Sequence, residues 1–228
     1  MSLTERAIAA LRRPDLLWVL ASNLIPVIGV TLYGWAALPL MVFYWIENVV
    51  IGGFNILKIL VSGFTKSRAL AVAAVFLSAF FVFHYGLFTF VHGIFVFAML
   101  SWSGEAQAGL DPNAAPDDVL TNVTALVNAD SDLYWSVVAL VAVQAGWFVF
   151  HWLLFGHWRT ASPITQMYEP YGRILVLHMT IMLATLPVII LGEPMFAVLI
   201  LAVLKSVMEL GLSGFNLPGS SDNRYQSS

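Results

Sequence analysis

The chain of 228 residues contains no cysteine, which excludes disulfide bonds, thiolate metal sites, iron–sulfur clusters and a cysteine nucleophile. Charge is also scarce: 10% of the residues are Asp, Glu, Lys or Arg, against about 25% in a typical soluble domain. The net charge of -3 is not that of a nucleic-acid-binding protein, so we expect no nucleic-acid partner. Hydrophobic residues instead make up 60% of the chain, and the mean hydropathy is +0.85. This composition predicts an integral membrane protein in contact with the lipid bilayer.

The apolar runs are long enough to predict the fold class, because a helix needs about 20 such residues to cross about 30 Å of hydrocarbon. We predict an all-α integral membrane bundle of six transmembrane helices, forming one domain over residues 1–216. An outer loop at 101–132, with a short helix near 119–127, separates its two halves, and residues 217–228 form a flexible tail. The expected spans are residues 15–35, 37–61, 70–100, 133–156, 173–191 and 194–213.

The few basic residues predict the orientation of these spans. Lys66 and Arg68 lie between the second and third spans, and Arg159 and Arg173 lie between the fourth and fifth. The loop at 101–132 contains acidic residues and no Lys or Arg. Because cytoplasmic loops of membrane proteins are enriched in Lys and Arg, we expect both termini in the cytoplasm.

The second span carries four polar side chains in an otherwise apolar segment. At about 100° per residue, Glu47, Asn55 and Lys58 share a sector of about 80°, and Asn48 lies about 20° beyond Asn55. This face should point into the bundle, because intramembrane ionisable groups are costly and usually mark a ligand site or a proton path. The alternative is structural, since Asn residues also hydrogen-bond between helices.

Three histidines and one acid fall at a similar depth when residues are counted from the outer end of each span. They are His84, His151, His178 and Glu209, and Asn55 belongs to the same layer. Three imidazoles and a carboxylate can hold a divalent metal, of which Zn is the first choice and Fe or Mn are alternatives. Each histidine also has a structural interpretation as a hydrogen-bonded residue, and a haem between His84 and His151 is a further alternative.

A second, outer layer is expected to contain Glu47, His92 and Lys205. His84 and His92 are about 12 Å apart along one helix, too far to bind the same ion. His92 would therefore hold a second ion, carry protons or pack structurally. Lys205 would be a charge partner for Glu47 or form a local pair with Glu209 at i,i+4.

Three motifs resemble an uncharacterised family of small bacterial integral membrane proteins, a domain of unknown function. They are WIEN at 45–48, FNILK at 54–58 and HYGLFTFVHG at 84–93. The resemblance implies a bacterial origin, and hence a multi-pass protein of the inner membrane, but it implies no activity. It also groups the polar residues of the second and third spans into one set.

These residues lead to three hypotheses for function: a metal-dependent enzyme acting on a membrane-embedded substrate, a proton- or ion-coupled transporter, or a non-catalytic membrane subunit. The substrate would be a small molecule or a lipid, and a homo-oligomer is compatible with each hypothesis. In the first, the catalytic residues are Glu47 and Glu209, and the metal ligands come from His84, His92, His151, His178 and Glu209. The residues expected to orient these ligands or contact substrate are Asn48, Asn55, Lys58, Gln144 and Lys205.

Overall fold

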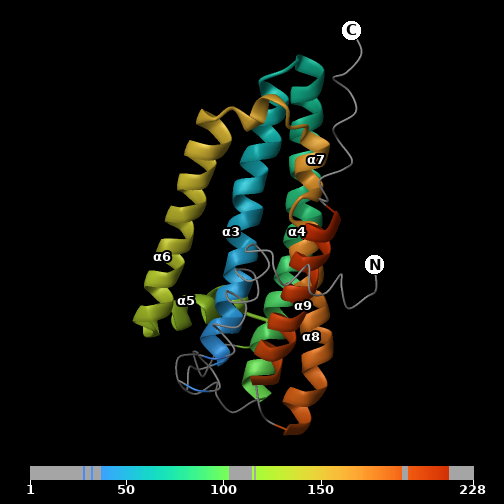
Figure 1. The fold of residues 1–228 in the computed structure, drawn as a ribbon. Helices are drawn as coiled ribbons and strands as arrows, with labels where there is room; N and C mark the ends of the chain where they lie inside the picture. Colours follow the sequence, from blue (N-terminus) through green and yellow to red (C-terminus); the bar gives the residue numbers. More distant parts are fainter. Residues whose placement is uncertain are drawn as a thin grey trace, which may run out of the picture.

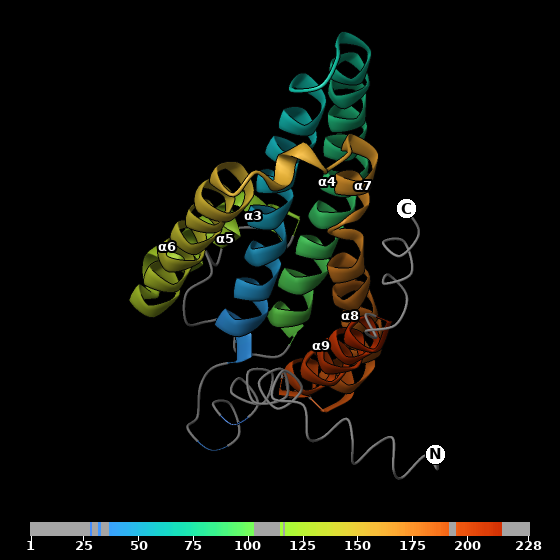
Figure 2. The same ribbon diagram turned by 45° about the horizontal axis from the view of Figure 1, so that its top comes forward.

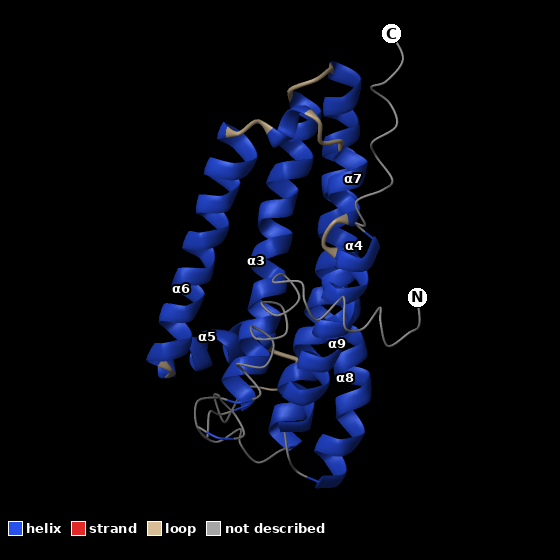
Figure 3. Cartoon of the chain, viewed as in Figure 1, coloured by secondary structure: helices blue, strands red, loops and turns tan. Residues whose placement is uncertain are grey.

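The computed structural model describes residues 37–102, 117–191 and 195–215, together with Ile28, Leu32 and Ala115. These residues form helices joined by short connections, without a strand in any described range (Figures 1 and 3). An all-helical fold was predicted from the sequence and is confirmed for these ranges. The predicted tail and all but two positions of the predicted first span lie outside the described residues.

Two long antiparallel helices form the centre of the fold. Helix α3 covers Ala37–Phe64 and α4 covers Arg68–Trp102. A tight turn joins them, in which Ser67 Oγ accepts a hydrogen bond from the Leu70 N–H at 3.2 Å. Gly63 lets the two helices approach closely near this turn, because a Cβ there would lie 2.3 Å from that of Ala74.

Two capped helices follow, and the second begins at the end of the bundle opposite that turn and runs beside α3 (Figure 1). The short helix α5 covers Val119–Ala129, and its first turn is capped by Asp118. Helix α6 covers Ser131–Gly146 and is capped by Asp130. Acidic caps stabilise a helix start because the carboxylate accepts hydrogen bonds from otherwise unpaired N–H groups. The short helix expected within the outer loop is therefore present.

Helix α6 continues without a break into a π-helical segment, η2, at Trp147–Leu154. The wider turn is closed by a hydrogen bond of 3.2 Å from the Phe155 N–H to the Phe150 carbonyl. π-Helical segments are rare and occur frequently at functional sites. The predicted fourth span is thus helical as far as Leu154, but its second half has a different angular period from that of an α-helix.

The chain then reverses through two short helices that the sequence analysis did not predict. Gly156 adopts a left-handed conformation, with φ of 79°, and leads into the 3-10 turn η3 at His157–Arg159. Helix α7 covers Pro163–Tyr168, with Ser162 as its cap. These elements place α7 against both α3 and α4.

Two antiparallel helices complete the described fold and pack beside each other (Figure 2). Helix α8 covers Tyr171–Leu191 and α9 covers Met195–Phe215. Helix α8 packs along α4, and α9 also contacts α3. Helix α4 is therefore flanked by α3 on one side and by α8 on another.

Among the described residues, three helical stretches are long and apolar enough to cross a membrane: Leu40–Phe64, Arg68–Met99 and Ser131–Leu154. Two shorter apolar stretches lie at Ile174–Leu183 and Met195–Val207. Large apolar side chains also cover the outside of α4, where Phe76 and Phe83 are about 70% exposed. Extended apolar surfaces of this kind mark a membrane or an interaction site, so these helices favour association with a lipid bilayer.

Candidate functional site

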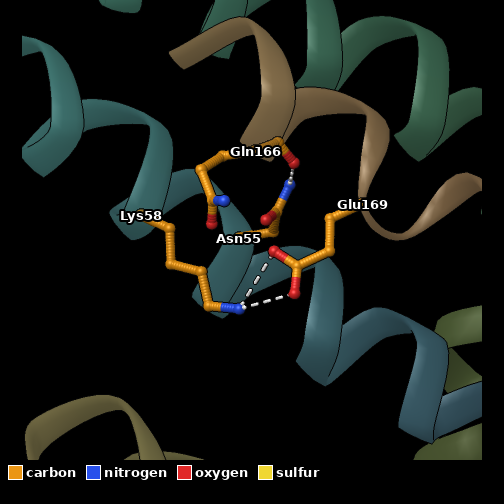
Figure 4. Close-up of polar contacts among 4 residues, drawn as sticks. All are labelled: Asn55, Lys58, Gln166 and Glu169. Atoms are coloured by element: carbon orange, nitrogen blue, oxygen red, sulfur yellow. Dashed lines mark hydrogen bonds and ion pairs between the residues drawn. The ribbon is translucent and has the colours of Figure 1, made fainter. Parts of the chain in front are cut away.

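The first polar site joins α3 to α7, segments more than one hundred residues apart in sequence (Figure 4). Lys58 Nζ lies 3.3 Å from both carboxylate oxygens of Glu169. The Lys58 side chain is only 11% exposed, whereas that of Glu169 is 50% exposed. Trp147 lies beside the ammonium group, with its ring centroid 4.6 Å from Nζ. The lysine is thus held by an acid and by an aromatic face.

Two amides lie beside this ion pair. Asn55 is almost fully buried, and its Nδ2 donates a hydrogen bond of 2.8 Å to the backbone carbonyl of Gln166. The remaining amide oxygens, Oδ1 of Asn55 and Oε1 of Gln166, are buried and receive no hydrogen bond from the described part of the chain. Figure 4 shows both amides close to the ion pair. Buried acceptors of this kind are costly unless a donor reaches them.

A cavity of about 270 Å³ opens at this ion pair, and we call it the Lys58 cavity. It lies between α3, the π-helical segment and the reversal that leads into α7. Lys66 Nζ hydrogen-bonds to the Ala161 carbonyl and so ties the α3–α4 turn to one wall. Its lining residues are Lys58, Trp147, Trp152, His157, Thr160, Ala161, Gln166 and Glu169.

The second polar site is a pair of histidines from α4 and α8. His92 Nε2 lies 2.9 Å from His178 Nδ1, a hydrogen-bonding distance between two imidazoles. The other ring nitrogen of His92 contacts the backbone carbonyl of Phe88 and therefore carries a hydrogen there, because a carbonyl can only accept. His92 Nε2 then acts as the acceptor, and His178 Nδ1 donates when both rings are neutral.

A second cavity, of about 250 Å³, connects this pair to His84. His84 and His178 both line it, together with Tyr171 at the start of α8. The rings of His84 and Tyr171 are stacked, with centroids 5.9 Å apart. We call this the histidine cavity, and it brings His84 and Tyr171 together with His178 of the pair.

Helices α3 and α4 are joined by a hydrogen bond close to the level of the histidine pair. The indole of Trp45, two residues before Glu47, donates a 2.8 Å hydrogen bond to the Thr89 carbonyl, three residues before His92. At Tyr44, the residue before Trp45, the ring centroid lies 5.0 Å from Lys205 Nζ. Helix α9 thus brings Lys205 to the part of α3 that carries Glu47, and the pairing of these two charges stays a prediction.

The polar face of α3 does point into the protein. Asn48 and Asn55 are buried, and Glu47 and Lys58 are partly buried, whereas Val49 is 43% exposed. The two asparagines nevertheless have different partners. Asn48 Nδ2 donates to the Tyr44 carbonyl of its own helix at 2.8 Å, whereas Asn55 connects α3 to α7.

Two predicted groupings differ from the structure. His178 was placed in the layer of His84 and away from His92, but it hydrogen-bonds His92 and also shares a cavity with His84. The depth count failed because it assumed that all helices end in one plane. Gln144 was placed on the face of His151 by α-helical spacing, and that spacing does not hold because π-helical geometry begins between them.

The predicted metal site is only partly covered by the structure. Within the described ranges, no three His, Asp or Glu side chains converge closely enough to hold an ion. The side chains of His151 and Glu209 lie outside this description, although their backbones belong to η2 and α9. The four-ligand site and the haem alternative therefore stay predictions.

Sequence reasoning missed Glu169 and Gln166, which complete the site around Lys58. Both lie in a connection that hydropathy marks as a loop. A signal was present in Ser162 followed by Pro163, a cap residue and a first-turn proline that together indicate a helix start. Which helix this short segment would meet was not visible in the sequence.

The fold and its interior together define a class: an all-helical protein with helices able to span a membrane and two polar sites between them. The chain matches DUF6498, a family of unknown function, over residues 5–220, and it belongs to this family. The expectation that the chain belongs to a family of unknown function is confirmed, whereas its motifs and its bacterial origin stay predictions. No curated protein and no solved structure matches the chain.

Proposed function

We propose that this protein is a proton-coupled membrane carrier with six spans and with its Lys58 end in the cytoplasm. The observation that carries the proposal is the hydrogen bond of 2.9 Å between His92 Nε2 and His178 Nδ1 inside the bundle. Imidazole gains and loses a proton near neutral pH, and histidine chains in membrane proteins act as proton relays.

The order of the polar groups supports a relay. Beginning at the Lys58 cavity, the chain offers Glu169, then Tyr171 stacked on His84, and then the pair of His178 and His92. A metal centre requires ligands that converge to about 2.0–2.2 Å from one ion. These groups are instead spaced along the bundle, which suits transfer between successive sites.

The test is proton flux in liposomes loaded with a pH-sensitive dye, driven by a potassium diffusion potential. We expect flux through the native protein and a loss of at least about tenfold in His92→Gln and His178→Gln, because glutamine keeps hydrogen bonding but cannot carry the proton. Met179→Leu, next to His178 on the exposed side of α8, is the matched control. Native-level flux in both histidine variants would refute the proposed relay.

A divalent-metal site is a second candidate, favoured by the same histidine pair. Glu209 lies on α9, which runs antiparallel to α8, at a distance from their connection similar to that of His178. His92, His178 and Glu209 would then hold Zn, Fe or Mn. Elemental analysis of protein purified without chelator decides between the candidates: near-stoichiometric metal that is lost in His178→Gln favours the metal site, and metal-free protein with proton flux favours the relay.

A further inference from the structure

We infer that the Lys58 cavity binds a small zwitterion, in which an ammonium group lies a few bonds from a carboxylate or a phosphate. The inference deepens the proposed function by naming the chemical class of its solute. Binding at the cavity is measured separately from proton flux, so that one can fail without the other.

The first argument is the pair of opposite charges at the cavity wall. Lys58 and Glu169 both line the cavity, and both Nζ–oxygen distances are 3.3 Å. Strong charge-assisted hydrogen bonds are shorter, about 2.7–2.9 Å. The pair is therefore formed, but its contacts are longer than those of the strongest charge-assisted pairs. A zwitterion can insert its anionic group at Lys58 and its ammonium group at Glu169 while keeping each charge paired.

The second argument is the number of acceptors near Glu169. An ammonium group has three N–H donors and no acceptor. The two carboxylate oxygens of Glu169 supply two acceptors at the cavity wall, and the side-chain amide of Gln166, which also lines the cavity, carries a third. Oε1 of Gln166 is buried without a hydrogen bond from the described part of the chain, so a turn of this side chain toward the cavity would bring it to a bound ammonium group. The site thus offers three acceptors for three donors.

The third argument concerns size and the remaining walls. A volume of about 270 Å³ falls just below the range of roughly 300–1,000 Å³ that suits drug-sized ligands, so the cavity suits a small solute. Trp147 and Trp152 supply aromatic walls, and the face of Trp147 already lies against the Lys58 ammonium. Aromatic faces also attract a ligand ammonium.

The chemistry fits two sources, a free amino acid or the headgroup of phosphatidylethanolamine. We would measure calorimetric binding of alanine, ethylamine and acetate to the detergent-solubilised full chain. A second arm compares thermal stability in nanodiscs of phosphatidylethanolamine with that in phosphatidylcholine, whose quaternary ammonium has no N–H donor. Alanine binding at least about tenfold tighter than that of ethylamine or acetate identifies a free solute. Stabilisation by phosphatidylethanolamine alone identifies the lipid.

Variants assign the binding to this cavity. Lys58→Gln should reduce alanine affinity towards that of ethylamine, and Glu169→Gln should reduce it towards that of acetate. The double variant Lys58→Glu with Glu169→Lys keeps an ion pair, and so keeps the fold, but it should weaken alanine binding, because a zwitterion turned to match the reversed charges would place its ammonium group away from the amide of Gln166. Leu57→Ala, at an exposed position beside Lys58, should bind as the native protein does. Three results would each overturn the inference. They are equal affinity for alanine and ethylamine, no binding in the calorimetric or the nanodisc measurement, and unchanged alanine binding in the charge-reversed variant.

Discussion

Two adjacent glycines on α3 give opposite predictions for the same substitution. A Cβ at Gly52 would lie 2.7 Å from Cε1 and 3.2 Å from Cδ1 of Tyr85 on α4. A Cβ at Gly53 would meet no atom within 4 Å, because this residue is exposed whereas Gly52 is buried. Gly52→Ala should therefore destabilise the protein, and Gly53→Ala should not.

The cost at Gly52 follows from how firmly Tyr85 is held. Carbon atoms pack best at about 3.5–4.0 Å, so the ring would have to move by about 0.8 Å or more. It is 4% exposed, stacks on Phe81 with centroids 4.6 Å apart, and donates a 3.1 Å hydrogen bond to the Asn48 carbonyl. Overpacking costs about 1–3 kcal/mol, and weakening the hydrogen bond costs up to about 1 kcal/mol more.

Replacing a helical glycine by alanine also contributes about 0.5–1 kcal/mol of stability through the unfolded chain. We therefore expect a net loss of about 1–3 kcal/mol for Gly52→Ala and a gain of up to about 1 kcal/mol for Gly53→Ala. Thermal unfolding in detergent, followed by tryptophan fluorescence, should show midpoint changes of roughly 2–4 °C per kcal/mol. Equal midpoints for the two variants would show that α3 and α4 do not pack at Gly52 as described.

Three further predictions concern electrostatics, hydrogen bonding and topology. A double-mutant cycle on Lys58→Gln and Glu169→Gln should give a coupling free energy of about 0.5–1 kcal/mol between the two side chains. This coupling should shrink at high salt because Glu169 is half exposed, and a larger, salt-independent coupling would contradict the prediction. Trp45→Phe should lose about 1–2 kcal/mol in denaturant unfolding, because its indole N–H donates to a buried carbonyl of α4, and native stability would argue against that bond. The chain has no cysteine, so Ser67→Cys and Ser131→Cys can be labelled individually. An impermeant maleimide should label Ser67→Cys only from the cytoplasmic side and Ser131→Cys only from outside.

The sequence predicted the helices well because their signal is local. Hydropathy and length placed five expected spans close to helices α3, α4, α6 with η2, α8 and α9. The short helix expected near residues 119–127 similarly corresponds to α5. Each of these features depends on residues within one helix, where periodicity and capping are readable.

The sites were harder to predict because they depend on pairing between helices. The inward face of α3 was predictable, since lipid offers no partner for Asn55 or Lys58. Their actual partners were not, because α7 is too short to have a recognisable period. The His92–His178 contact was missed for another reason: residue counting cannot show how far one helix is shifted along its neighbour.

The π-helical segment at Trp147–Leu154 also affects how the length of this chain can vary. In a π-helix, residues five apart lie above one another, so Trp147 and Trp152 can face one cavity; in an α-helix they would be about 140° apart. Deleting one residue here would restore α-helical winding and separate the two indoles, while leaving the span long enough to cross the membrane. A single-residue change in chain length would thus alter the wall of the Lys58 cavity without altering the number of helices.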